Sequence, residues 1–248
     1  MAKSLITLVL LCASLSARVT APNATAGDEG NPGASSAHSL NPVIEWNRTL
    51  LAIVRTAGAQ PPTIHSTRSF AILHATVYDA VNNIDGIFSP YLVRLPDVSR
   101  RASRPAAADQ AAHDVLVALY PAFQATLDAE LQQDLAQIAD GENKSDGITV
   151  GQAVATQILS LRSSDGSGIT PPPFVPGNQP GGYQLTPPNF GAEDFTQRPK
   201  VTPFALARAN EFRPGPPPEL TSDEYSSVFD EVKSLGFIHS TTRTSEQT

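Results

Sequence analysis

The chain has almost no cysteine. Cys12 is the only cysteine among 248 residues, and it lies inside an apolar N-terminal run. A lone thiol can form no intramolecular disulfide and no multi-thiolate zinc site. Because residues 1–26 are typical of a cleaved export signal, the mature chain would contain no cysteine, which also excludes a cysteine nucleophile.

Long apolar runs are also scarce. The run Leu5–Ala17 is shorter than the roughly 20 residues that a membrane span requires, and no later run is longer. It follows Lys3, and residues 24–26 (Ala-Thr-Ala) offer small side chains at a cleavage position. We therefore expect a signal peptide over residues 1–26, an exported protein and no membrane span. An uncleaved anchor or a mispredicted start of the chain is the alternative.

Basic residues are outnumbered. The chain has 17 Lys and Arg against 24 Asp and Glu, a net charge of −7. Signal cleavage would remove two basic residues and no acidic one, which moves the charge to about −9. A nucleic-acid-binding protein needs a basic face to neutralise phosphates, so nucleic acid is not an expected partner.

Strand-like alternation is absent, and the apolar residues recur at helical spacing instead. After a flexible Gly- and Ser-rich arm over 27–40, the pattern predicts an all-α helical bundle over 41–165. Gly151, inside one of these helices, is expected to permit close contact with a neighbouring helix. Helices are predicted over 42–57, 64–83, 105–119, 121–138 and 145–162, and from Thr221 or Ser222 to Gly236.

Proline changes the character of the chain after the bundle. Of the 22 prolines, 13 fall between Pro171 and Pro218, a density that excludes both helix interiors and sheet ladders. The stretch also contains six aromatic residues, whereas disordered linkers are poor in aromatic residues. They are Phe174, Tyr183, Phe190, Phe195, Phe204 and Phe212. We predict a Pro/Gly-rich strap over 166–219 that is pinned onto the bundle, followed by a helix and polar tail over 220–248.

His74 is the most prominent candidate for chemistry, because it lies with Tyr78 and Asp79 in an apolar helix. A helical metal site would need a second ligand three or four residues away, and His65 is nine residues upstream. The simpler interpretation is that His74 and Asp79 are buried polar groups bonded to neighbouring helices. The metal site remains the alternative.

The remaining candidates assemble no active site. Glu130 with Asp134 is predicted to lie on a solvated helix face, as are Asp230 and Glu231. Ser66 and Ser69 lie near His65 without an orienting acid, and Arg100, Arg101 and Arg104 fit a solvated turn. We assign no catalytic, cofactor-binding or metal-binding residue.

Several blocks, in order and at matching spacing, resemble the N-terminal half of bacterial vanadium-dependent haloperoxidase-like proteins. These belong to the type 2 phosphatidic acid phosphatase and haloperoxidase superfamily, and the resemblance spans about residues 42–248. The blocks lie at residues 43–47 (VIEWN), 70–83, 147–151, 161–166, 203–206, 212–218, 220–225 (LTSDEY), 231–236 and 243–244.

The resemblance implies two four-helix bundles, of which this chain would hold the first. Complete members carry a vanadate or phosphate site in the second bundle, recognised by a Lys with a downstream Arg-Pro, a Pro-Ser-Gly-His block and a Ser-Arg block followed by His. These blocks are missing here, since Arg198-Pro199 is followed by Lys200 instead of preceded by lysine. Vanadate is therefore expected only with a C-terminal half.

Three functions follow as expectations. The first is the N-terminal portion of an exported haloperoxidase-like protein, which would oxidise halide with peroxide once complete and be inactive alone. The second is an acid phosphatase of the same superfamily, and the third is a non-catalytic exported helical module. The expected partner is the missing C-terminal bundle, and without it we predict exposed apolar surface on the last helix and self-association.

Overall fold

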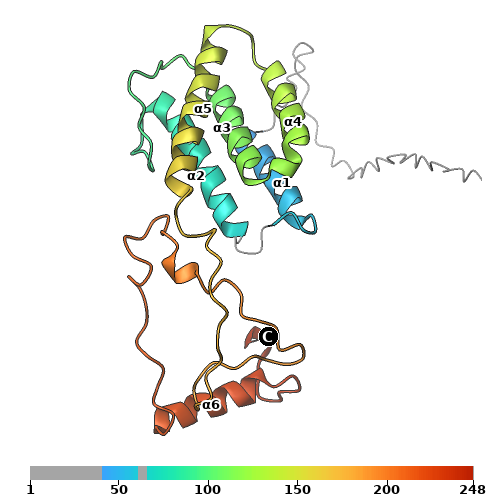
Figure 1. The fold of residues 1–248 in the computed structure, drawn as a ribbon, viewed down its shortest axis with the longest axis vertical. Helices are drawn as coiled ribbons and strands as arrows, with labels where there is room; N and C mark the ends of the chain where they lie inside the picture. The colour runs from blue at the N-terminus through green and yellow to red at the C-terminus, as the bar shows by residue number, and fades with distance from the viewer. Residues whose placement is uncertain (1–40, 61–65, 248) are drawn as a thin grey trace, which may run out of the picture. The chain divides into compact units, whose positions relative to one another are not determined.

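A computed structural model describes residues 41–60 and 66–247. The predicted signal peptide, the arm and His65 lie outside these residues. The described part is helical and has no strand, so the predicted all-α class is confirmed (Figure 1). Its α-helices are α1 (Pro42–Arg55), α2 (Ser66–Asp85), α3 (Arg104–Leu119), α4 (Gln124–Ala136), α5 (Glu142–Arg162) and α6 (Asp223–Gly236). Short 3₁₀ turns are η1 (Pro121–Phe123), η2 (Arg198–Lys200) and η3 (Ser245–Gln247).

Side-chain caps begin three of the helices. The Asn41 carboxamide oxygen accepts a hydrogen bond from the Val43 backbone at 2.9 Å, and Pro42 occupies the first helical position, as predicted. Ser103 caps α3 and Ser222 caps α6 in the same way. The predicted start of the fourth helix at Pro121 is a 3₁₀ turn that leads into α4, and α5 begins at Glu142, one turn earlier than predicted.

Helix α3 lies at the centre of the bundle and packs against α1, α2, α4 and α5 (Figure 1). Its inward positions are small: Ala106, Ala107, Ala111 and Ala112 are fully buried. Small side chains let helix axes approach closely, so the close packing of α3 follows from its alanine content.

Helix α5 meets α3 through two glycines, Gly147 and Gly151. A Cβ atom on Gly151 would lie 2.6 Å from the Ala107 carbonyl oxygen and 2.9 Å from the Gln110 Cβ. Both distances are shorter than van der Waals contact, so the backbone of α3 occupies the space that a side chain would need. The predicted role of Gly151 in close helix contact is confirmed.

Replacing Gly151 by alanine is expected to lower the free energy of unfolding by about 1–2 kcal/mol, because overpacking against α3 outweighs the gain in helix propensity. Urea denaturation measures the change. The matched control is Gly236→Ala at the end of α6, where an added Cβ meets no atom within 4 Å. Equal stability of the two variants would contradict the close packing.

The strap is held at fewer points than its aromatic residues suggest. Phe204 packs against the bundle core, whereas Phe174, Tyr183, Phe190 and Phe212 are exposed. Among these five aromatic residues, Phe204 is therefore the contact between the strap and the bundle core. Aromatic content alone does not tell which rings find a hydrophobic surface to cover.

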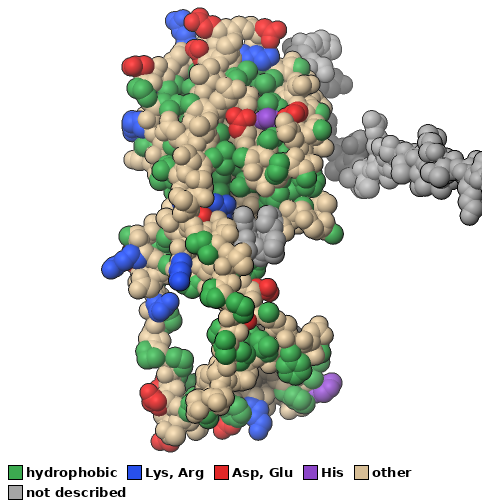
Figure 2. Space-filling model, in the orientation of Figure 1, with side chains coloured by type: hydrophobic (Ala, Val, Ile, Leu, Met, Phe, Trp, Pro, Cys, Tyr) green, Lys and Arg blue, Asp and Glu red, His purple; other side chains and the backbone are tan. Residues whose placement is uncertain are grey.

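Helix α6 has no buried residue. Val228, Phe229 and Val232 on the helix, with Phe237 and Ile238 directly after it, are large apolar side chains exposed to solvent. Figure 2 shows hydrophobic side chains on the surface of this C-terminal segment. The predicted exposed apolar surface is present, and self-association remains a prediction. A search of the described residues found no helix that is both long enough and apolar enough to cross a bilayer.

Candidate functional site

His74 is a half-buried side chain held between α1 and α2. Its Nε2 lies 3.0 Å from the Asn47 side-chain oxygen, and its ring stacks on Phe70 at a centroid distance of 6.4 Å. Burial lowers the pKa of His74, which favours the neutral ring at pH 7. The predicted bond to a neighbouring helix is confirmed. Among residues 41–60 and 66–247, no three His, Cys, Asp or Glu side chains are grouped to hold a metal ion.

Asp79 is fully buried, but its partners differ from the prediction. Its two carboxylate oxygens accept hydrogen bonds from the backbone N–H groups of Tyr91, Leu92 and Val93, at 2.6, 2.8 and 2.8 Å. These donors belong to the loop after α2 and not to a neighbouring helix. The prediction was wrong because a helical pattern cannot show that the chain folds back over its own helix.

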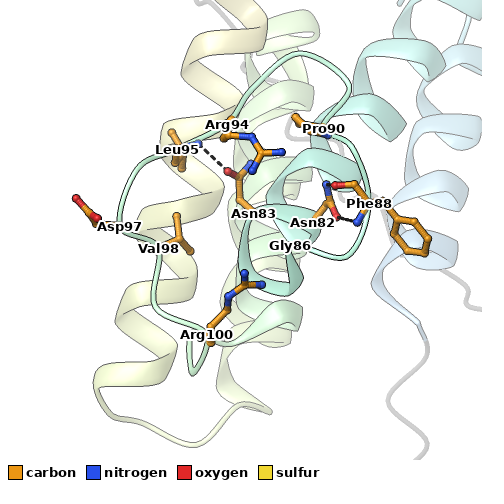
Figure 3. A pocket seen from close by; sticks show the side chains of 10 residues that line it. All are labelled: Asn82, Asn83, Gly86, Phe88, Pro90, Arg94, Leu95, Asp97, Val98 and Arg100. Atoms are coloured by element: carbon orange, nitrogen blue, oxygen red, sulfur yellow. Dashed lines mark hydrogen bonds between the residues drawn. The ribbon is translucent and has the colours of Figure 1, made fainter.

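Two asparagines extend this support for the loop. Asn82 bonds both the N–H and the carbonyl of Phe88, and Asn83 accepts from the Leu95 N–H (Figure 3). Asn83 also donates to the Val93 carbonyl. Together with Asp79 they hold residues 88–95 against α2. The loop backbone therefore takes a defined path without secondary structure of its own.

Arg100 covers the C-terminal end of α2. Its guanidinium donates to the carbonyls of Ile84 and Asp85 and lies against Gly86, which has a φ of +57°. A cation at a helix C-terminus is stabilising. A cavity of about 250 Å³ opens beside it, lined also by Arg94, with Asp97 pointing away (Figure 3). The basic run predicted as a solvated turn is exposed, but Arg100 also has this capping role.

Four carboxylates lie close together where α1, α3 and α4 meet: Glu45, Asp109, Glu130 and Asp134. Asp109 is buried and accepts a hydrogen bond from the Trp46 indole at 3.0 Å, and Glu130 accepts one from the Thr49 hydroxyl at 2.6 Å. One oxygen of Asp134 is buried without a hydrogen-bond partner among the described residues. The predicted solvated face of Glu130 and Asp134 is thus half-buried, whereas Asp230 and Glu231 are exposed as predicted.

Burial makes these carboxyls weak acids. It raises the pKa of Asp109 to about 7, since the Trp46 bond does not compensate for lost hydration and the charges of Asp134 and Glu45 add repulsion. Burial likewise raises the pKa of Asp134 to about 6, with repulsion from Glu45 and Glu130. Burial also raises the pKa of Glu130.

Between about pH 4 and pH 7 the contribution of these carboxyls to stability is expected to fall as pH rises, because the folded state holds protons that the unfolded state has released. Replacing Asp109 by Asn keeps an acceptor for Trp46 and removes the titration. We expect the variant to have the flatter profile and to be more stable at about pH 8 by roughly 1–2 kcal/mol. Denaturation at several pH values measures this; a profile parallel to that of the exposed control Asp230→Asn would contradict it.

His113 is a site residue that the sequence analysis did not single out. Its Nδ1 lies 2.9 Å from Asp114 and its Nε2 lies 2.8 Å from Asp128. Burial lowers its pKa, but the hydrogen bonds and negative charges of the two aspartates outweigh burial, so the pKa is raised overall. Adjacency to Asp114 was a signal in the sequence, whereas Asp128 comes from another helix.

Two buried arginines lie at the junction between the bundle and the strap. Arg68 donates from Nε to Asp165 at 2.8 Å and from Nη2 to the Arg162 carbonyl at 2.9 Å. Burial alone would raise the pKa of Asp165, but the bonds from Arg68 and Ser167 outweigh it and hold that pKa low. Asp165 is therefore charged at neutral pH and its pairing is lost in acid.

Arg162 makes the contacts to the strap itself. It donates to the Thr202 carbonyl at 3.0 Å and to the Tyr91 hydroxyl at 2.8 Å, and its guanidinium lies 3.8 Å above the Phe204 ring. Tyr91 in turn donates to the Phe204 carbonyl at 2.6 Å. We call Arg68, Tyr91, Arg162, Asp165 and Phe204 the strap clamp.

Three cavities can be compared with the histidine and cationic side chains that a vanadate site would need. The cavity that contains His74 has no arginine or lysine in its lining. The two cavities lined by arginine pairs, Arg94 with Arg100 and Arg68 with Arg198, have no histidine. Binding of vanadate through histidine together with cationic side chains therefore has no place among these cavities.

Comparison with known proteins identifies the architecture. No protein-family model and no curated protein match the chain. A solved structure described as the first bacterial vanadium-dependent iodoperoxidase does match, with 23% sequence identity and a TM-score of 0.58. The fold is haloperoxidase-like. The match covers 79% of this chain and 48% of the iodoperoxidase, so the chain spans about half the length of that protein.

Proposed function

We propose that this chain supplies the N-terminal helical bundle of an exported vanadium-dependent haloperoxidase-like protein, and that it is inactive without a second bundle. The observation that carries the proposal is the extent of the fold match, which includes most of this chain but 48% of the iodoperoxidase. A half of a two-bundle protein would give this proportion. We assign no catalytic residue of the whole protein to this chain.

Two features of the described residues support a partner bundle. The apolar side chains of α6 and the residues after it are exposed, and surfaces of this kind usually mark contacts with another protein surface. The strap clamp fixes the strap to α2 and α5, so the strap would already be held in place when a second bundle binds. The oxyanion chemistry would then depend on residues of the second bundle.

The first test is the transcript immediately beyond the Thr248 codon. We expect an in-frame continuation that carries a Lys with Arg-Pro, a Pro-Ser-Gly-His block and a Ser-Arg block followed by His. A stop codon with no such blocks encoded beyond it would contradict the proposal and leave a non-catalytic helical module.

The second test is enzymatic. The chain alone, supplied with vanadate, peroxide and iodide, is expected to show no turnover, whereas the chain joined to its continuation oxidises iodide in a vanadate-dependent way. Turnover by the chain alone would contradict the proposal. A joined protein that hydrolyses a phosphate monoester and leaves iodide unoxidised would favour the phosphatase alternative.

A further inference from the structure

A cavity of about 400 Å³ lies where the first turn of α2 meets the strap segment around η2. This volume is in the range of small-molecule sites. Its chemistry differs from that of the other cavities because two arginines occur in an otherwise mainly apolar lining. The residues that carry the argument are Thr67, Arg68, Ala71, Arg198, Phe204 and Leu206.

Arg68 brings an unused hydrogen-bond donor to this cavity. The residue is 6% exposed, and its Nε and Nη2 are occupied by Asp165 and the Arg162 carbonyl. Its third nitrogen, Nη1, has no hydrogen-bond partner in the part of the chain that the structure describes. This nitrogen is not among the fully buried unpartnered atoms of the described residues, so it is open to an acceptor that enters the cavity, and a charged donor makes a strong hydrogen bond there.

The other charges near the cavity also favour an anion. Arg198 occurs in none of the ion pairs among the described residues, and Lys200 follows on the same 3₁₀ turn. In Figure 2 several basic side chains lie close together at the level of η2. The first turn of α2 has no acidic residue, so the positive end of the helix dipole is not neutralised there. The nearby carboxylate of Asp165 is engaged by Arg68 and Ser167.

The apolar walls of the cavity favour an organic anion over an inorganic ion. Ala71, Val201, Phe204 and Leu206 surround the arginines with apolar surface, which an organic body can cover and a hydrated ion cannot. Apolar walls also exclude water, which strengthens the attraction between a guanidinium and an anionic head group.

We propose that this cavity binds a small organic anion, with a carboxylate or phosphate head group that accepts hydrogen bonds from Arg68 and Arg198 and a short apolar body against Ala71 and Leu206. Because the cavity is walled by both α2 and the strap, the bound anion contacts both. Binding therefore fastens the strap to the bundle. This site is independent of the oxyanion chemistry of a second bundle.

The test uses the purified chain with octanoate and octyl phosphate, both at constant ionic strength and below micelle-forming concentrations. Isothermal titration calorimetry is expected to show saturable binding of at least one anion, and about tenfold weaker binding of octan-1-ol, which lacks the charge. The bound anion is also expected to slow tryptic cleavage after Lys200 on the strap. No binding of either anion, or equal binding of octanol, would overturn the proposal.

Variants distinguish anion binding at this site from nonspecific electrostatic attraction to the protein surface. Arg198→Gln is expected to weaken anion binding about tenfold, whereas Arg48→Gln, an equal charge change at an exposed position of α1, leaves it unchanged. Ala71→Leu fills the cavity and is expected to abolish binding while the circular dichroism of the bundle is retained. Equal affinities of the Arg198 and Arg48 variants, or unchanged binding in a folded Ala71→Leu protein, would overturn the proposal.

Discussion

Replacing Asp79 by alanine is expected to lower the free energy of unfolding by about 3–5 kcal/mol, measured by urea denaturation. The carboxylate is fully buried and accepts three backbone hydrogen bonds, from Tyr91, Leu92 and Val93. Alanine leaves all three donors without an acceptor, and it also leaves a cavity where the carboxylate stood. The loop over α2 then loses its main attachment.

Two comparisons make the Asp79 result specific. Asp79→Asn keeps the shape of the side chain but turns an NH₂ group toward a backbone donor, so we expect most of the loss to remain. Asp85→Ala removes a carboxylate from the same helix whose partner is the exposed Arg104, and is expected to cost about 1 kcal/mol or less. A loss at Asp79 no larger than the loss at Asp85 would show that the loop is held by other contacts.

Replacing Arg162 by methionine is expected to release the strap while the bundle stays folded. Methionine keeps an apolar stem of similar length but cannot donate to Thr202 and Tyr91 or lie as a cation over Phe204. Hydrogen bonds from a charged donor contribute about 1.5–3 kcal/mol each, so local opening is expected to become about a hundredfold more frequent.

Limited trypsin digestion measures this opening. Trypsin does not cut the Arg198–Pro199 bond, so cleavage after Lys200 reports on the strap next to the clamp. When opening and closing are fast, the cleavage rate follows the population of the open form. Arg48→Met on α1 is the control and is expected to leave the rate unchanged. An equal rate in both variants, or loss of the bundle's circular dichroism in Arg162→Met, would contradict local release.

The stability of the bundle and the attachment of the strap therefore depend on different groups. The core rests on the small inward face of α3, into which the glycines of α5 fit. The strap rests on a few charged side chains at the ends of α2 and α5. Mutations in the two regions should thus give separable effects, one on global unfolding and the other on local opening.

Helix positions could be predicted because they depend on local patterns. The spacing of Trp46, Leu50 and Ile53 places one face of α1 in the core, and Asn41 with Pro42 marks its start. The predicted helix bounds differ from the observed ones by a few residues, as at α5, because capping and 3₁₀ turns decide the last turn. The resemblance to haloperoxidase-like proteins also indicated the fold that the structural comparison then identified.

The polar contacts could not be predicted, because their partners are distant in sequence or lie in loops. Arg68 and Asp165 are 97 positions apart, and Asp109 meets Trp46 across 63. A carboxylate beside a leucine stripe, such as Glu130, has the same pattern whether it faces water or a neighbouring helix. The aromatics of the strap give the same difficulty, since Phe204 and Phe212 look equivalent until the chain is folded.

By itself the sequence determined the all-α class, the positions of the helices and their apolar faces, the acidic charge and the proline-rich strap, because each depends on local composition or on spacing within one element. Only the tertiary structure decided where Asp79 finds its donors, which carboxyls become weak acids and which side chains clamp the strap. Desolvation and hydrogen bonding depend on what the other elements bring to a site, and that is settled when the helices pack.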